Sequence, residues 1–340
     1  MFIKKNDRKF FNCISYSNIM KCYDIFIIGG GINGAGIARD ASGRGLSVYL
    51  AEKNNVGSAT SSWSSKLIHG GLRYLENYEF KLVRESLKER EIITNIAPNI
   101  TKPLPFIIPY KKTLRSKLLI RLGLFLYDNL GGKTKIPKSS NVDFRKNYSN
   151  ILDKKYSTGY KYYDVQVDDK KLVEMNIEDA KKLGATIVEN KKVVTAKNKK
   201  NCWEITLENN ETVKAKILIN AGGPWINEIL KNVIKVNNKK SIRLVRGSHI
   251  ITNKLYKDNV AFTLQNNDKR IVFVIPYNKK YSLIGTTEVD VNHPNNPTIS
   301  NEEKLYLINT VNEHFLKQIS VRDIIDTYSG IRPLIENFKE

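Results

Sequence analysis

Cysteine is scarce in this sequence, with 3 among 340 residues: Cys13, Cys22 and Cys202. The number is odd and no pair has C-x-x-C spacing, which argues against a disulfide framework and a zinc site and fits a reducing compartment. We predict no bound metal. Long apolar runs are also missing. Because no run of about 18 apolar residues occurs, we do not expect a transmembrane helix.

Acidic residues are in deficit, with 34 Asp and Glu against 56 Lys and Arg, so the formal net charge is +22. The basic residues are spread along the whole chain instead of forming a stripe with interleaved aromatics, so we predict no nucleic-acid partner. The excess charge favours anionic surfaces and substrates, such as phospholipid headgroups and phosphate esters. With 340 residues and 41% hydrophobic content, the chain is expected to form two domains.

Glycine is concentrated in the sequence Gly-Gly-Gly-Ile-Asn-Gly at 29–34, which directly follows an apolar run at 23–28. A second apolar run, at 46–51, ends at Glu52. A G-x-G-x-x-G turn between strand and helix brings backbone N–H groups close to a pyrophosphate, and an acidic residue about 20 positions later receives ribose hydroxyls. The spacing therefore predicts a Rossmann-like dinucleotide site.

The next segments are read from their periodicity. A hydroxyl-rich loop at 58–65 is a candidate ligand loop. Residues 80–96 have a helical period, and the prolines that follow are expected to end that helix. Residues 111–127 alternate basic and apolar side chains, which fits either a helix lying on a membrane or a buried helix with a solvated basic face. Residues 131–150 are expected to be a polar loop.

The remaining segments predict a further helix followed by strands, and then a second domain. A strand of continuous apolar residues leads into Ala-Gly-Gly-Pro-Trp at 221–225. Like the turn at 29–34, this segment places glycines at the carboxyl end of a strand, and two such strand ends imply one extended cofactor. Apolar β-rich runs from 242 onward predict an antiparallel sheet. The expected strands are 185–189, 203–207, 212–220, 242–252, 260–265, 270–276 and 281–287, and the expected helices are 165–183 and 300–318.

These segments together resemble the FAD-dependent glycerol-3-phosphate dehydrogenases, respiratory enzymes that pass electrons to quinone. The resemblance covers nearly all of the chain from Tyr23 onward. It is carried by residues 27–47, by Thr-Ser-Ser-Trp-Ser-Ser-Lys-Leu-Ile-His-Gly-Gly-Leu-Arg-Tyr-Leu-Glu at 60–76, and by residues 221–225, 246–250, 270–276, 285–287 and 330–334.

The resemblance implies an α/β fold: a Rossmann-like FAD-binding domain of the glutathione-reductase and D-amino-acid-oxidase type, with a second, antiparallel β-rich substrate domain. The domains expected from it are an N-terminal extension (1–21), the first part of the FAD domain (22–97), an insertion with the basic amphipathic segment (98–150), the second part of the FAD domain (151–228), the substrate domain (229–328), and a return to the FAD domain (329–340).

The activity implied is oxidation of sn-glycerol 3-phosphate to dihydroxyacetone phosphate, with hydride transfer to FAD and electrons passed to membrane quinone. One alternative is an oxidase that uses dioxygen, because these motifs do not encode the electron acceptor. Another is a truncated flavin-binding subunit that has no activity of its own. A homodimer and a second polypeptide partner are both left open.

The resemblance also assigns site residues. It places His249 and Arg332 at the reacting carbinol, where a neutral histidine suits the base and an arginine suits a phosphate or alkoxide. It places Arg73, Tyr74 and His69 at the substrate, and His293 and His314 are expected at the surface. The expected cofactor-binding residues are Gly29, Gly31, Asn33, Gly34, Glu52, Lys53, Thr60, Ser61, Ser62, Ser64, Lys66, Leu67, His69, Gly71, Gly222 and Trp225.

The chain departs from the family at its end. It stops at Glu340, whereas the family continues through a Gly-Gly-Lys segment that returns to the flavin and through a helical domain. We therefore expect a fragment, one half of a split enzyme, or a decayed reading frame. The expected location is the cytoplasm, with peripheral attachment to the inner membrane. Residues 1–21 lack the apolar core of a secretory signal, and Met20 is an alternative start; if they are an organelle-targeting extension, the location becomes mitochondrial.

Overall fold

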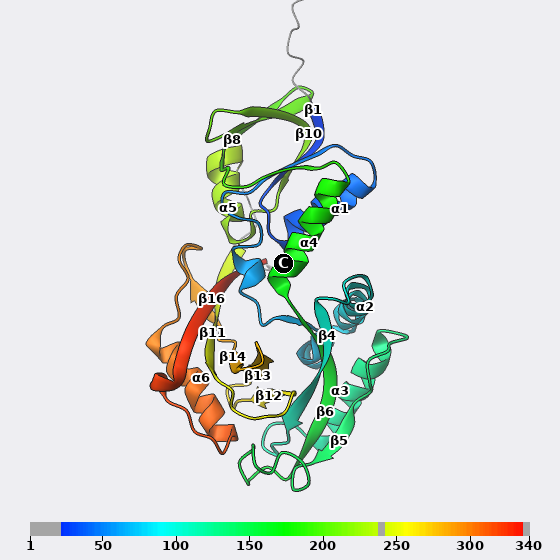
Figure 1. Cartoon of the computed structure of the whole chain (residues 1–340), viewed down its shortest axis with the longest axis vertical. Helices are drawn as coiled ribbons and strands as arrows, with labels where there is room; N and C mark the ends of the chain where they lie inside the picture. The colour runs from blue at the N-terminus through cyan, green and yellow to red at the C-terminus, as the bar shows by residue number, and fades with distance from the viewer. Residues whose placement is uncertain (1–21, 237–241, 336–340) are drawn as a thin grey trace, which may run out of the picture.

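The computed structural model describes residues 22–236 and 242–335. The N-terminal extension, Cys13 and the last five residues lie outside this range, so the predictions made for them are not addressed by the structure. Figure 1 shows two stacked parts, with a six-stranded sheet at one end and a ten-stranded sheet at the other. Within the described residues, no helix is both long and apolar enough to cross a bilayer.

The six-stranded sheet has the order β7-β2-β1-β10-β9-β8. Its first four strands run parallel, and β9 and β8 continue it antiparallel. Helices α1 and α4 pack together against one face. The bounds are β1 (Cys22–Ile28), α1 (Ile32–Gly43), β2 (Val48–Ala51), α4 (Asp169–Lys182), β7 (Thr186–Val188), β8 (Val193–Lys199), β9 (Cys202–Leu207) and β10 (Thr212–Asn220).

Alanine spacing explains why α1 lies so close to this sheet. Ala35, Ala38 and Ala41 recur at intervals of three and are buried against Ile27 and Leu50 of the two central parallel strands. Small side chains at a helical period form a narrow apolar face on which a helix packs closely. This packing sets the position of the first turn of α1, which directly follows the glycine-rich turn.

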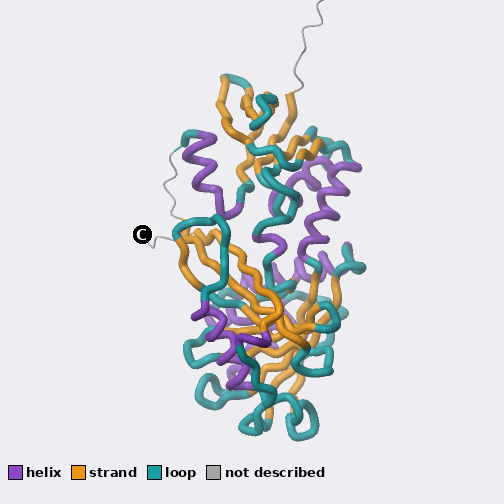
Figure 2. Tube along the Cα trace, turned by 60° about the vertical axis from the view of Figure 1, so that its left-hand side comes forward, coloured by secondary structure: helices purple, strands orange, loops and turns teal. Residues whose placement is uncertain are grey.

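The ten-stranded sheet has the order β15-β11-β14-β13-β12-β4-β6-β3, with β16 on the other edge of β11 and β5 on β6. Helix α6 covers the β11 to β13 region, and α2 and α3 cover β4 and β6 (Figure 1). Figure 2 shows helices lying beside the strands of the lower part. The bounds are β3 (Leu67–Ile68), α2 (Phe80–Ile96), β4 (Thr101–Pro109), α3 (Lys117–Leu130), β5 (Ser140–Asp143), β6 (Thr158–Val167), β11 (Ile242–Asn253), β12 (Ala261–Gln265), β13 (Ile271–Tyr277), β14 (Tyr281–Gly285), β15 (Val289–Val291), α6 (Asn301–His314) and β16 (Ile324–Ile335).

The predicted fold class is confirmed, and the helix at 80–96 and the strand at 212–220 have the predicted bounds. The segment 98–150, which was expected to be an insertion, supplies β4 and β5 to the large sheet. Strand β4 contains Pro103 and Pro105, which pair only with β6. A proline is tolerated in a strand where its missing N–H faces no partner, and β12 joins only at 106–107.

Strand β16 runs without a break across 328/329 and stays paired with β11, so the domain boundary expected there stays a prediction. Strand β8 was not predicted, because its Lys and Asn residues hide the alternation. His314 was expected at the surface and that was wrong: its imidazole is buried, stacks on Tyr156 and bonds the carbonyl of Thr310. His293 is exposed as expected.

Candidate functional site

The glycine-rich turn between β1 and α1 has no room for side chains. Gly29 has φ +107°, and a Cβ there would lie 2.5 Å from the carbonyl oxygen of Ala221 at the end of β10. A Cβ on Gly34 would overlap the carbonyl oxygen of Gly29. The turn therefore brings bare backbone to the edge of the sheet, as a site for a pyrophosphate requires.

The N-terminus of α1 is available to an anion. Gly31 is its N-cap, and within the described residues it has no side-chain cap and no acidic residue in its first turn, where Asn33 is exposed. The N–H of Ile32 donates to Ser61 Oγ at 3.0 Å, and a Cβ on Gly31 would lie 3.1 Å from the same oxygen. A helix start with no acidic residue in its first turn has a positive dipole end, which favours a phosphate.

Three more of the expected cofactor residues lie around this turn. Glu52 accepts from the N–H of Gly30 at 2.7 Å and from the N–H of Asn54 at 2.9 Å, so its carboxylate is fixed at the end of β2. Lys53 Nζ lies 3.6 Å from the ring centroid of Trp225, and burial lowers the pKa of that lysine. These features fit the adenosine diphosphate half of FAD.

The loop that follows β2 joins the two sheets. It includes the short helix η1 (Thr60–Ser62), and Thr60 Oγ1 donates to the carbonyl of Ile331 in β16 at 2.9 Å. A Cβ on Gly330 would lie 3.1 Å from Trp63, so β16 passes directly under the loop. One stretch of chain therefore links the start of α1, through Ser61, to the second sheet.

Other polar groups of this loop are used to hold its shape. Ser62 is buried and donates to the carbonyl of Gly57. Ser64 Oγ and Lys66 Nζ each lie 2.7 Å from a carboxylate oxygen of Asp169 in the first turn of α4. The charge of Lys66 is thus paired within the protein, so its role toward a cofactor stays a proposal.

His249 is enclosed between two neighbouring strands. On β16, Tyr328 stacks on the imidazole with ring centroids 4.7 Å apart. On β14, Gly285 lies opposite, and a Cβ there would be 2.7 Å from His249 Cγ. A residue larger than glycine at 285 would push the ring away, so strand pairing fixes the plane of the imidazole.

His249 is kept neutral. Burial, with the nearby charges of Arg332 and Lys66, lowers the pKa of His249 to about 3. Nε2 shares a 2.9 Å hydrogen bond with Ser65 Oγ, and Nδ1 is buried with no partner among the described residues. A base must be neutral before it accepts a proton, but a pKa of about 3 also makes this imidazole a weak base near pH 7.

Arg332 lies near enough to His249 for its charge to lower the pKa of the imidazole. A Cβ on Gly247, two residues before His249, would lie 2.6 Å from Arg332 Nη2, so the guanidinium lies directly against the backbone of Gly247. Arg332 Nη2 also donates to Thr286 Oγ1 at 3.3 Å. The two residues that the family resemblance assigns to the reacting carbon thus lie near each other.

The opposite face of β11 is fixed by a buried carboxylate. Glu303 of α6 accepts from Ser248 Oγ at 2.8 Å and from Thr287 Oγ1 at 2.5 Å, and Arg246 Nη2 lies 2.6 Å away. Burial opposes ionisation, but these donors lower the pKa of Glu303. The network holds the strand directly behind His249.

The expected substrate residues lie on a separate turn. Arg73 and Tyr74 are exposed on the short helix η2 (Leu72–Asn77), and His69 Nδ1 accepts from the N–H of Gly71 at 3.1 Å. His69 also lines a cavity of about 390 Å³ with Glu85 and other residues. No hydrogen bond or ion pair in the described part of the chain joins this turn to His249 or Arg332.

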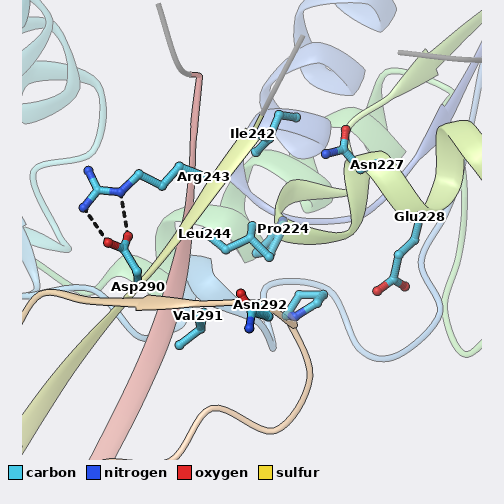
Figure 3. Close-up of a pocket in the computed structure, with 10 residues that line it drawn as sticks. Pro224, Asn227, Glu228, Ile242, Arg243, Leu244, Asp290, Val291 and Asn292 are labelled. Carbon is cyan, nitrogen blue, oxygen red and sulfur yellow. Dashed lines mark hydrogen bonds and ion pairs between the residues drawn. The ribbon is translucent and has the colours of Figure 1, made fainter. Parts of the chain in front are cut away.

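A second cavity, of about 430 Å³, lies where β11 begins (Figure 3). It is lined from η3 (Gly223–Trp225), α5 (Ile226–Glu228), β11 and the β15 region, and an ion pair between Arg243 and Asp290 closes one side. Trp225 follows Pro224 of its lining, but none of the sequence-predicted site residues lines it. Two expected cofactor residues, Gly222 and Leu67, have structural contacts in this part of the chain. A Cβ on Gly222 would overlap Ile229, and Leu67 pairs with β6.

Sequence reasoning missed four residues around His249: Ser65, Tyr328, Gly285 and Thr286. Ser65 belongs to the hydroxyl-rich loop, so its residue type was a usable signal. Tyr328 and Gly285 are defined only by strand pairing with β11, which no local pattern reports.

Comparison with known proteins identifies the family of this chain. The model of the FAD dependent oxidoreductase family matches residues 24–339. The chain is 45% identical to the glycerol-3-phosphate dehydrogenase of Pseudomonas aeruginosa over 324 residues, which cover 94% of this chain and 63% of that protein. It is 43% identical to the D-erythritol 1-phosphate dehydrogenase of Brucella abortus, covering 93% and 64%. The chain thus spans less than two thirds of the length of these relatives.

Solved structures give the same fold. The glycerol-3-phosphate dehydrogenase from Bacillus halodurans, complexed with FAD, superposes with a TM-score of 0.74 and 25% identity, covering 93% of this chain and 58% of that one. The L-α-glycerophosphate oxidase from Mycoplasma pneumoniae, with FAD bound, gives 0.77 at 16% identity, covering 94% and 85%. At 16% the likeness concerns the fold alone.

The glycine turn predicts the effect of two alanine substitutions. Gly29→Ala should abolish FAD retention, because its Cβ would collide with the Ala221 carbonyl at a positive φ. Gly36→Ala is the control: its Cβ meets nothing within 4 Å inside α1, so it should keep FAD and gain up to about 1 kcal/mol of stability. The measurement is the flavin-to-protein absorbance ratio after gel filtration. Equal FAD content in both variants would contradict the turn assignment.

The neutral state of His249 predicts a pH dependence of stability. Its pKa is about 3 when folded, against 6.5 for the free side chain. Between these values the unfolded chain binds the extra proton, so this contribution to the free energy of unfolding is complete above pH 6.5 and is lost as the pH falls. We therefore measure the free energy of unfolding by urea denaturation at pH 7.5 and at pH 5. Between these pH values it should fall by about 2 kcal/mol less in the His249→Gln variant than in the wild type.

The matched control is His293→Gln, in which the replaced ring is exposed. This variant should follow the wild type at both pH values. If His249→Gln and His293→Gln lose the same stability on acidification, His249 is not held neutral by the fold.

Proposed function

This chain belongs to the FAD-dependent oxidoreductases, and from that premise we propose that it oxidises sn-glycerol 3-phosphate to dihydroxyacetone phosphate. Support for this substrate comes from the names of the relatives at 43–45% identity, two of which act on phosphorylated polyols. The net charge of +22 also favours an anionic substrate. Bound FAD would supply the hydride acceptor.

The observation that carries the proposal is that His249 and the charge of Arg332 lie near each other, on two paired strands that reach the loop before the start of β3. Thr60 and Ser61 connect β16 to the dinucleotide turn, so a flavin whose diphosphate lies at α1 would extend toward β11 and β16. An oxidoreductase of this class needs a base and an anion-binding group at that end of its cofactor. His249 and Arg332 supply them.

Each side chain has a definite task in this reaction. The imidazole of His249 takes the proton of the C2 hydroxyl while hydride leaves C2, and Ser65 and Tyr328 keep the ring in its plane. The Arg332 guanidinium stabilises the developing alkoxide through charge-assisted hydrogen bonds. We assign Arg73 and Tyr74 on η2 to the phosphate end of the substrate, since both side chains are exposed and arginine binds phosphate well.

We propose membrane quinone as the electron acceptor and α3 as the element that contacts an anionic bilayer. Leu118, Leu122 and Phe125 form an exposed stripe along this helix, with Leu118 81% exposed, while Leu124 and Tyr127 on the other face are buried. Lys117 and Arg121 flank the stripe. An apolar stripe bordered by basic side chains is the pattern of a helix lying in a membrane interface.

Arg332→Ala tests the reaction. With FAD bound and oxygen excluded, glycerol 3-phosphate should bleach the wild-type flavin band, and the variant should bleach at least about 100-fold more slowly with its FAD content unchanged. Arg322→Ala, on the exposed turn η5 (Val321–Asp323), is the control and should match the wild type. Full activity of Arg332→Ala would refute the site. If an erythritol phosphate bleaches the flavin and glycerol 3-phosphate does not, the substrate is a different phosphorylated polyol.

Leu122→Glu tests the membrane contact. It should reduce co-sedimentation with vesicles rich in phosphatidylglycerol by about tenfold, because a charge replaces a lipid-facing leucine. Leu305→Glu on α6 is the control, since Leu305 is also an exposed helical leucine. If both variants bind vesicles as the wild type does, α3 is not the contact. Peroxide formation in air without quinone would favour the oxidase alternative.

A further inference from the structure

A buried ion pair lies beneath the turn that carries His69. Arg90 of α2 donates through Nη1 to Asp164 Oδ1 of β6 at 2.8 Å, and both residues are no more than 5% exposed. Burial raises the pKa of Asp164, and the charge of Arg90 opposes that rise. A buried ion pair often stabilises a fold less than apolar residues of the same size would. Its presence in an apolar cluster that includes Leu87 therefore calls for another role.

Tyr127 of α3 connects this pair to the backbone of the turn. Its hydroxyl donates to Asp164 Oδ1 at 2.7 Å and accepts from the N–H of Gly70 at 2.7 Å. Burial and the nearby Asp164 raise the pKa of Tyr127, so the hydroxyl keeps its proton and its donor role. The orientation of every group is thus fixed, from Arg90 through Asp164 and Tyr127 to Gly70.

The turn itself has little freedom to move. A Cβ on Gly70 would overlap Leu87 and lie 2.9 Å from the Tyr127 ring, so the backbone lies directly against these side chains. Gly71 has φ +71° and is the residue from which η2 starts, so the direction of that helix depends on the Gly70 peptide. Arg73 and Tyr74 follow within one turn. A displacement at Gly70 would therefore move both exposed side chains.

We propose that Tyr127 is a positioning residue for the substrate turn, with Asp164 and Arg90 holding its hydroxyl in place. The role of the turn in substrate binding rests on the function proposed above. The hydrogen bond to Gly70 sets where η2 begins, and with it the place of Arg73 and Tyr74. The helix that carries the exposed apolar stripe thus also fixes the turn that receives the phosphorylated substrate.

Tyr127→Phe removes the hydroxyl and keeps the ring. Tyr162→Phe is a matched control, because Tyr162 lies in the same core, its ring centroid is 6.0 Å from that of Tyr127, and its hydroxyl bonds Thr263 Oγ1. Hydrogen exchange of the FAD-loaded chain should show amides in 67–77 exchanging about tenfold faster in Tyr127→Phe, as expected when one hydrogen bond is lost. Tyr162→Phe should exchange there as the wild type does.

Anaerobic bleaching separates positioning from a general loss of structure. In Tyr127→Phe the glycerol 3-phosphate concentration for half-maximal bleaching rate should rise about tenfold, as for one lost hydrogen bond, while the rate at saturation stays the same. Equal exchange and equal half-saturation in the two variants would overturn the proposal. If the wild type itself does not bleach, the proposed function fails, but exchange at 67–77 still decides whether Tyr127 holds the turn.

Discussion

Two hydrogen bonds from adjacent residues connect the dinucleotide turn to the second sheet, and the arrangement of the site depends on them. Ser61 receives the first N–H of α1, and Thr60 donates to the backbone of β16. Neither bond is strong by itself, since each contributes about 1 kcal/mol net. Their importance is geometric. They set the distance between the place for a diphosphate and the paired strands that carry His249 and Arg332.

The site is shaped as much by missing side chains as by present ones. Gly247 leaves the space that Arg332 fills, and Gly285 leaves the space beside the His249 ring. On the other face of β11, Glu303 and its donors hold the strand in register. A strand alternates its side chains between two faces, so one face can be anchored in the core while the other forms a site. The functional side chains therefore need few contacts of their own.

Local patterns were sufficient for much of the fold. The glycine turn, the 80–96 helix and the 212–220 strand were predicted because each is decided by neighbours in sequence. Strand β4 was missed because prolines normally end strands. Its prolines at 103 and 105 are tolerated because β12 pairs with β4 only at residues 106–107, beyond them. The pairing of His249 with Tyr328 was beyond prediction for a similar reason, since it is set by the register of two strands about 80 positions apart. Family resemblance supplied His249 and Arg332, which composition alone could not.

Helix α3 has two faces that meet different surroundings. Tyr127 reaches inward to the backbone of Gly70, while Leu118, Leu122 and Phe125 point outward. Each residue turns an α-helix by about 100°. Inserting or deleting one residue between Leu118 and Tyr127 would therefore rotate one face away from its surroundings. The length of this segment is constrained even though half of it lies at the surface, and homologous chains should tolerate substitutions here far better than changes in length.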